Sequence, residues 1–211
     1  MTAPSSNVEE FRHALASEAD AYGVNLSAHA MDGLSEYYEL LNSWNTRLHL
    51  VAPCSPHQFA TRHILESLIL LSFLPTGAKV ADVGSGAGLP ILPCLIVRPG
   101  INATLIDSSK KKAVFLREVI NRTKLSKSTN VIAERFEDIT APEVDFVTCR
   151  ALERFETKLQ SLLKLSPSGS TPLFFGGPGL REQLSHLDLN FKEEKIPNSE
   201  RRYLFVIERP R

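Results

Sequence analysis

Short apolar runs that alternate with amphipathic stretches constrain the fold of this chain more than any other feature. We expect strands over Val80–Val83, Ala103–Ile106, Asn130–Ala133, Phe146–Cys149, Pro172–Phe175, Phe191–Ile196 and Tyr203–Ile207. Helices are expected over Pro90–Val97, Lys110–Lys124 and Glu153–Leu165. Strands that alternate with helices form right-handed crossovers, and the last two strands are close enough for a hairpin. The pattern predicts an α/β fold with a mostly parallel, seven-stranded sheet.

Helical periodicity dominates the residues before this region. Apolar side chains recur every three to four positions from Phe11 to Tyr22 and again from Met31 to Trp44, and a further helix is expected over Pro56–Leu71. Pro75, Thr76 and Gly77 then end the helical pattern. We expect residues 1–75 to form a helical extension that packs on a Rossmann-like core of residues 76–211, so that the whole is effectively one domain.

Composition excludes several classes of protein. The longest apolar run, Leu68–Leu74, is too short to cross a bilayer, and the polar N-terminus lacks a secretory signal, which favours the cytoplasm. The formal net charge of zero argues against nonspecific coating of nucleic acid, although a local basic patch could dock RNA. Cys54, Cys94 and Cys149 are odd in number and widely spaced, so we expect reduced packing residues and no metal site.

A glycine-rich loop follows the first expected strand, in the sequence Ala81–Pro90. Gly84, Gly86 and Gly88 suit a tight turn that approaches a ligand closely, and Pro90 is expected to begin the next helix. Asp107 ends the second strand, where a carboxylate can accept hydrogen bonds from ribose hydroxyls. Asp82 could orient the loop amides or face the methionine end of a cofactor.

The loop distinguishes between two kinds of nucleotide cofactor. A dinucleotide-binding fingerprint requires glycine at position 89, where this chain has Leu89. The combination of strand, loop, helix and Asp107 therefore favours S-adenosylmethionine and a class I methyltransferase fold over a nicotinamide enzyme.

Several sequence blocks resemble the bacterial RsmG (GidB) family of methyltransferases, which methylate N7 of a guanine in 16S ribosomal RNA. The matching blocks are residues 41–45 (LNSWN), 62–67 (RHILES), 82–90, 97–99 (VRP), 105–116 (LIDSSKKKAVFL) and 149–151 (CRA). The resemblance implies S-adenosylmethionine as cofactor and 16S rRNA or the small ribosomal subunit as partner. A monomer is expected.

The resemblance, together with the loop, implies a set of cofactor contacts: Gly84, Gly86, Leu89, Asp107, Phe136, Glu137 and Arg150. Phe136 could wall the adenine, although a core aromatic is the commoner role for phenylalanine. Glu137 could instead be a charge at a helix start. Arg150 ends a strand, where its charge could pair with the methionine carboxylate of the cofactor. The alternative interpretation is that Arg150 is an arginine of the protein surface without a role in binding.

Further site candidates lie outside the set of cofactor contacts, and His63 could instead have a structural role that braces the loop. His63, Glu66 and Ser67 fall at i, i+3 and i+4 and therefore share a helix face, and only the resemblance makes His63 and Ser67 candidates for the active site. Cations that could contact RNA phosphates are Lys111, Lys112, Arg117 and Arg202. The lysines stand beside Lys110 at a helix start, where positive charge opposes the helix dipole, and a solvated face is an equally good explanation.

Three departures from the family pattern bear on the substrate. His49-Leu50-Val51 stands where the family usually has Asn-Leu-Thr, and Glu66 replaces an aspartate. Gly176-Gly177 follows the fifth strand, where a lysine-glycine is usual. Two alternatives stay open: a class I methyltransferase that acts on another substrate, and a non-catalytic relative that binds RNA or the ribosome. The missing lysine is the best argument for the second.

Overall fold

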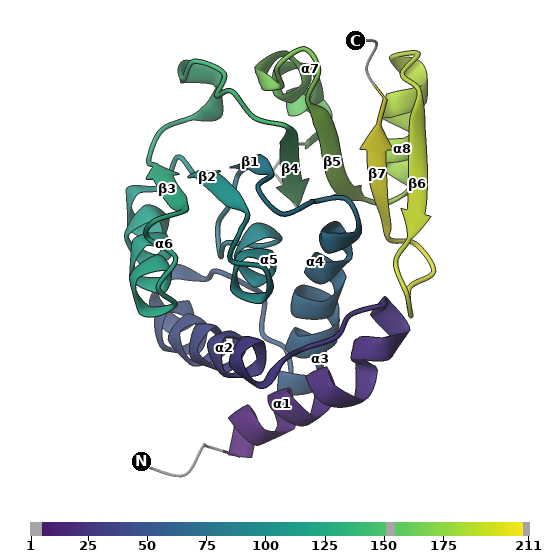
Figure 1. The fold of residues 1–211 in the computed structure, drawn as a ribbon. Coiled ribbons are helices and arrows are strands. Elements are labelled where there is room, and N and C mark those ends of the chain that lie inside the picture. Colours follow the sequence, from purple (N-terminus) through teal and green to yellow (C-terminus); the bar gives the residue numbers. More distant parts are fainter. Residues whose placement is uncertain (1–5, 151–154, 209–211) are drawn as a thin grey trace.

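A single sheet forms the centre of the molecule (Figure 1). The computed structural model describes residues 6–150 and 155–208. Their seven strands run in the order β3-β2-β1-β4-β5-β7-β6. The strands are β1 Lys79–Val83, β2 Asn102–Ile106, β3 Thr129–Ile132, β4 Phe146–Arg150, β5 Thr171–Gly176, β6 Phe191–Lys195 and β7 Tyr203–Ile207.

The pairing of the strands confirms the predicted topology. Strands β3, β2, β1, β4 and β5 are parallel neighbours, whereas β7 is antiparallel to both β5 and β6. The strand order reverses between β1 and β4, and open α/β sheets bind ligands at the carboxyl ends of the strands on either side of such a point. The fold is the predicted Rossmann-like one, and a site is expected at the ends of β1, β2 and β4.

Most of the helices match the sequence pattern; α8 and the short 3-10 helix η4 were not predicted. They are α1 Ser6–Glu18, η1 Ala19–Tyr22, α2 Ala28–Leu48, α3 Pro56–Phe59, η2 Ala60–Leu65, α4 Glu66–Leu68, η3 Ile69–Ser72, α5 Ile91–Val97, α6 Lys110–Arg122, η4 Phe136–Asp138, α7 Phe155–Leu165 and α8 Pro178–His186. The helix expected over Pro56–Leu71 is present as α3 to η3, with a π-helical turn at η2. No helix was expected between β5 and β6, so α8 corrects the prediction.

Local chemistry explains where several helices begin. Ser55 and Gln58 form a capping box at the start of α3, and Pro56 occupies the first turn. Ser109 caps α6 by accepting a hydrogen bond from the Lys112 amide. Helix α5 begins at Ile91 rather than at the predicted Pro90, which is its N-cap. The predicted start of α7 at Glu153, like Ala151 of the family block, lies outside the described residues.

Two apolar clusters cover the two faces of the sheet. One contains α7 and α8 residues such as Leu159 and Leu184, packed against Val83 of β1. The other combines Val80 with residues of α5, α6 and the N-terminal helices. It is a single cluster whose members are spread along the sequence between Val8 and Leu204. Within this cluster, the rings of Phe11 and Tyr38 stack at 4.4 Å between centroids. Figure 1 shows α1, α2 and α3 gathered at one end of the sheet.

The described residues include all three cysteines. Cys94 and Cys149 are buried, as expected of packing residues, but Cys54 is exposed, and none of the three is in a disulfide. Among the described residues, no helix combines the length and apolar character that crossing a membrane requires.

Candidate functional site

The glycine-rich loop joins β1 to α5 at the carboxyl edge of the sheet. Gly84, Gly86 and Gly88 all adopt positive φ angles, of 71°, 53° and 84°, which non-glycine residues rarely adopt. The amides of Gly84 and Ser85 donate to the Ile106 carbonyl, at 2.8 and 3.1 Å, so the loop is anchored to the end of β2. A Cβ at Gly88 would lie 2.1 Å from Leu92 Cδ1. The loop therefore needs glycine for both its backbone and its packing on α5.

This close approach makes Gly88→Ala a sharp test of the loop. We expect the substitution to lower the free energy of unfolding by about 2–4 kcal/mol, because it combines backbone strain with overpacking. Gly169→Ala is the matched control: its φ of 89° is equally unfavourable, but a Cβ there meets nothing within 4 Å. It should cost only about 1–2 kcal/mol. Urea denaturation of both variants measures the difference, and equal losses would contradict the packing argument.

Asp107 follows β2 and faces the loop. Its Oδ2 accepts a hydrogen bond from the Gly86 amide at 2.8 Å, and its Oδ1 accepts one from the Ser109 amide at 2.8 Å. The residue is only 8% exposed, and the two backbone donors hold the carboxylate in place. Each carboxylate oxygen can accept a further hydrogen bond, which leaves capacity for the ribose hydroxyls that the sequence analysis assigned to it.

Asp82 lies beneath the same loop. Its Oδ1 accepts a hydrogen bond from Thr148 Oγ1 at 2.7 Å across the β1–β4 pair, whereas Oδ2 is buried and has no hydrogen-bond partner among the described residues. Complete burial, with a smaller contribution from the nearby Asp107 charge, raises the pKa of this carboxyl to about 7, although its contacts with hydroxyl groups oppose the shift. An orphaned, buried carboxylate oxygen suits a cationic ligand group such as an α-ammonium.

The N-terminal helices support the loop from behind. The hydroxyl of Tyr37 in α2 donates to the Ala87 carbonyl at 2.8 Å, and the side chain is fully buried, which raises its pKa. A Cβ at Gly33, one turn earlier, would lie 2.8 Å from Ile96 of α5. Neither residue was predicted to belong to the site. Only the alternation of small and aromatic residues on one face of α2 hinted at this close packing.

The remaining cofactor candidates lie around the same edge. Leu89 and Phe136 are buried and belong to the two apolar clusters, so Phe136 is a core aromatic whether or not it also contacts an adenine. Glu137 lies 3.5 Å from Arg135 and 3.9 Å from Lys158, in the first turn of η4. Glu137 is therefore a charge at a helix start, as the alternative interpretation had it. Its contact with the cofactor stays a prediction.

Arg150 joins this edge to the helices that precede the sheet. Its guanidinium donates to the Arg62 carbonyl, to Ser67 Oγ at 3.4 Å and to Glu66 Oε2 at 3.2 Å. It also lies 5.6 Å from the centroid of the Phe175 ring. The side chain is 15% exposed, so Arg150 is not the surface arginine of the alternative interpretation.

A cavity of about 540 Å³ opens beside Arg150 at the carboxyl ends of β4 and β5. His63 and Glu66 line it together, and Ser67 contacts Arg150 from the same helix, as their spacing predicted. Burial and the neighbouring Arg150 charge lower the pKa of His63 to about 4, so this imidazole is neutral at neutral pH. The cavity is large enough for a nucleotide base.

The structure explains the absence of a lysine at position 176. A Cβ there would lie 2.5 Å from Leu180 Cδ2 and 2.9 Å from Leu180 Cβ, because α8 begins directly after β5. Pro178 in the first turn and the buried pair Leu180 and Leu184 could have predicted α8 from the sequence. Any side chain at Gly176 would displace this helix.

The cations proposed to contact RNA are divided between two places. Arg202 lines the cavity beside Gly176. Lys111 and Lys112 lie in the first turn of α6, next to Asp107. Arg117 donates to the Val131 carbonyl at 3.1 Å and thereby connects α6 to β3. Arg117 is therefore already engaged structurally, whereas Arg202 lines the cavity at the carboxyl ends of β4 and β5.

The fold and site together define a class. A buried carboxylate with one unpartnered oxygen under a glycine loop, an acid at the end of β2 and a cavity beyond β4 are the arrangement of a class I methyltransferase that uses S-adenosylmethionine. The chain resembles a SAM dependent methyltransferase from Aquifex aeolicus, with a TM-score of 0.54, 17% identity and coverage of 82% of this chain and 95% of that one. It also resembles TYW2 from M. jannaschii in complex with AdoMet, with a TM-score of 0.55, 15% identity and coverage of 69% and 73%.

Sequence comparison identifies the family within this class. A family model described as rRNA small subunit methyltransferase G (GidB) matches residues 30–201. A ribosomal RNA small subunit methyltransferase G from Erwinia tasmaniensis is 34% identical over 82% of this chain and 84% of its own length. One from Desulfotalea psychrophila is 28% identical over 89% and 90%. The chain belongs to the rRNA small subunit methyltransferase G family, as the sequence motifs indicated, and it is an S-adenosylmethionine-dependent methyltransferase.

Proposed function

We propose that this protein transfers the methyl group of S-adenosylmethionine to N7 of a guanine in 16S rRNA. The orphaned Asp82 Oδ2 beneath the loop and the cationic cavity beside Arg150 are the observations that carry this proposal. The family relatives are named for ribosomal RNA of the small subunit, and net positive charge beside the site suits a polyanionic substrate. We further infer that the protein acts as a monomer in the cytoplasm.

The residues present fit the cofactor in distinct ways. Asp82 would take the ammonium group, Asp107 the ribose hydroxyls, and the backbone of Gly84 to Leu89 would pass beneath the sulfonium. Arg150 would approach the methionine carboxylate from the end of β4, and Phe136 would flank the adenine. When bound, the cofactor supplies an electrophilic methyl carbon.

The protein needs no general base for this reaction. Guanine N7 carries a free lone pair, so the enzyme has only to align the base, exclude water and hold the ring still. The neutral imidazole of His63 adds no charge next to a base that becomes cationic on methylation. Its Nδ1 is buried and has no partner among the described residues, which leaves it available to the base. The protein therefore acts by positioning.

The direct test is methyl transfer from labelled S-adenosylmethionine. We expect label in 16S rRNA when the protein is incubated with small subunits or rRNA from a strain that lacks the gene, and binding heat with the cofactor by calorimetry. Primer extension on the same rRNA locates the modified guanine. Cofactor binding without label in any ribosomal fraction would refute the substrate, and the absence of binding heat at high cofactor concentration would refute the cofactor site.

A further inference from the structure

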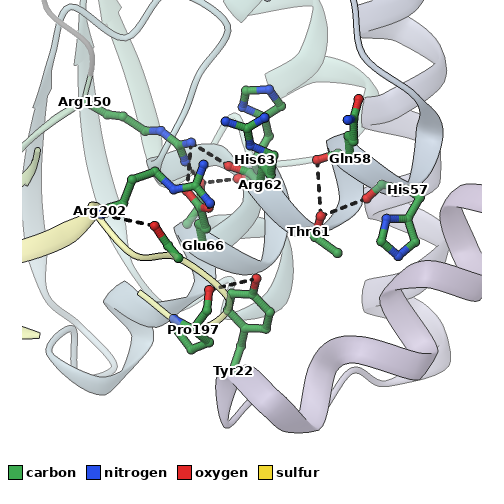
Figure 2. Close-up of polar contacts among 12 residues, drawn as sticks. Tyr22, His57, Gln58, Thr61, Arg62, His63, Glu66, Arg150, Pro197 and Arg202 are labelled. Carbon is green, nitrogen blue, oxygen red and sulfur yellow. Dashed lines mark hydrogen bonds and ion pairs between the residues drawn. The ribbon is translucent and has the colours of Figure 1, made fainter. Parts of the chain in front are cut away.

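One buried carboxylate brings together three distant parts of the chain. Glu66 lies in α4, and its side chain is 2% exposed. Its Oε2 is 3.2 Å from Arg150 Nη2 at the end of β4, and its Oε1 is 2.7 Å from Arg202 Nη2, just before β7. Figure 2 shows the guanidinium groups of Arg150 and Arg202 close together at Glu66. The Tyr22 hydroxyl, which donates to the Pro197 carbonyl at 3.4 Å, brings the β6–β7 turn to the same helical region.

The charges around Glu66 do not balance. Three arginines line the cavity, Arg62, Arg150 and Arg202, against the single carboxylate. In residues 6–150 and 155–208, no second carboxylate lies within 4 Å of any of the three guanidinium groups. Burial raises the pKa of Glu66 while the arginines lower it. A closed structural ion pair would have balanced charges. The excess of positive charge beside an open cavity therefore indicates a site for an anionic ligand.

The donors that remain point to the chemistry of that ligand. Arg202 Nε is buried and has no acceptor among the residues the structure describes, although the side chain as a whole is 34% exposed. A buried guanidinium N–H without an acceptor is costly and is expected to meet one in the functional complex. Guanidinium groups match the oxygens of phosphate in geometry. A phosphodiester is the anion that an RNA substrate would bring here.

We propose that Glu66 is a positioning residue for RNA: it holds Arg150 and Arg202 at the cavity so that Arg202, with Arg62, binds a phosphodiester next to the target nucleotide. The proposal rests on the proposed function and adds a substrate contact to it. Glu66 itself touches neither cofactor nor RNA. Its negative charge lies close to a polyanion, so simple electrostatics and positioning predict opposite effects of removing it.

Glu66→Gln tests this difference in sign. The substitution keeps the shape and removes the charge, so electrostatics alone predicts tighter RNA binding, whereas loss of positioning predicts weaker binding. We expect the KM for small subunits or rRNA to rise about tenfold. The change in kcat should be less than threefold and cofactor affinity should stay within twofold of the wild type, because the Arg62 carbonyl and Ser67 still hold Arg150 in the variant. We also expect Arg202→Gln to raise KM to a similar degree and the double variant to be no worse than Arg202→Gln alone, since neighbouring residues that act together are not additive.

Glu193→Gln is the matched control. Glu193 forms an ion pair of the same length with Arg181, at 2.7 Å, but it is more exposed than Glu66 and lies on the outer strand β6, outside the lining of the cavity. It should leave KM unchanged. If folded Glu66→Gln has a KM equal to or below that of the wild type, the positioning role is wrong. If Glu66→Gln does not fold, Arg202→Gln decides: an unchanged KM overturns the phosphate contact. Wild-type protein that labels no RNA would instead refute the proposed function.

Discussion

Asp107→Ala should weaken S-adenosylmethionine binding at least about 100-fold. The carboxylate has two tasks in the structure: it fixes the Gly86 and Ser109 amides at 2.8 Å, and its remaining lone pairs face the place where we expect the ribose. Hydrogen bonds to a charged group contribute about 1.5–3 kcal/mol each, and 100-fold in affinity corresponds to about 2.7 kcal/mol, so the loss of two ribose contacts is sufficient. Calorimetry with the cofactor measures the effect.

Two further variants separate the ribose contacts from the support of the loop. Asp107→Asn keeps the shape and can still accept from one amide, so it should retain the fold and lose most of the affinity. Asp145→Ala removes the same type of residue with the same type of contact, since Asp145 Oδ2 accepts from the Lys79 amide at 2.8 Å at the opposite end of β1. The affinity of Asp145→Ala for S-adenosylmethionine should equal that of the wild type. A comparable loss in Asp145→Ala would show that the effect arises from general destabilisation.

The sequence was sufficient to predict the sheet and the position of the glycine-rich loop. Alternation of apolar runs with helices is a local signal, and the positions of Gly84 and Asp107 follow from strand ends, which parallel strands bring to one edge. The helix α8 was missed because the run of glycines before Pro178 resembles a loop, whereas Leu180 packs on Gly176 and stabilises the helix through tertiary contact. The same contact accounts for the missing lysine, which the sequence could present only as a departure.

The convergence of charges in the cavity could not be predicted in the same way. Glu66 and Arg202 are 136 positions apart, and Arg202 reaches the cavity only because β7 pairs with β5 and the β6–β7 turn folds against the helical region. Periodicity describes which face of a helix is apolar, but it contains no information on which distant side chain meets that face. The burial of Glu66, and hence its need for partners, is likewise a property of the assembled fold.

Protonation of Asp82 should control cofactor affinity near neutral pH. Burial raises the pKa of this carboxyl to about 7 in the free protein, so its protonation state changes in the neutral pH range. An ammonium group binds only the carboxylate, and the dissociation constant should therefore rise about tenfold for each pH unit below 7 and level off above about pH 8. Calorimetric titrations between pH 5.5 and 8.5 measure this dependence. A flat profile in the wild type would mean that Asp82 Oδ2 does not meet the cofactor.

Asp82→Asn supplies the control for this profile and a second, independent measurement. It should bind the cofactor weakly and without the steep dependence below pH 7, because the amide does not titrate. The folded-state pKa of Asp82 lies above the usual 3.8, so the folded wild-type protein binds more protons than the unfolded chain between about pH 4 and 7. Its stability should fall as pH rises through this range, by at most about 1.4 kcal/mol per pH unit from this group, and Asp82→Asn should lack that component. Cofactor affinity and folding stability should therefore change over the same pH range in the wild type. This agreement would assign both effects to the buried carboxyl of Asp82 under the glycine loop.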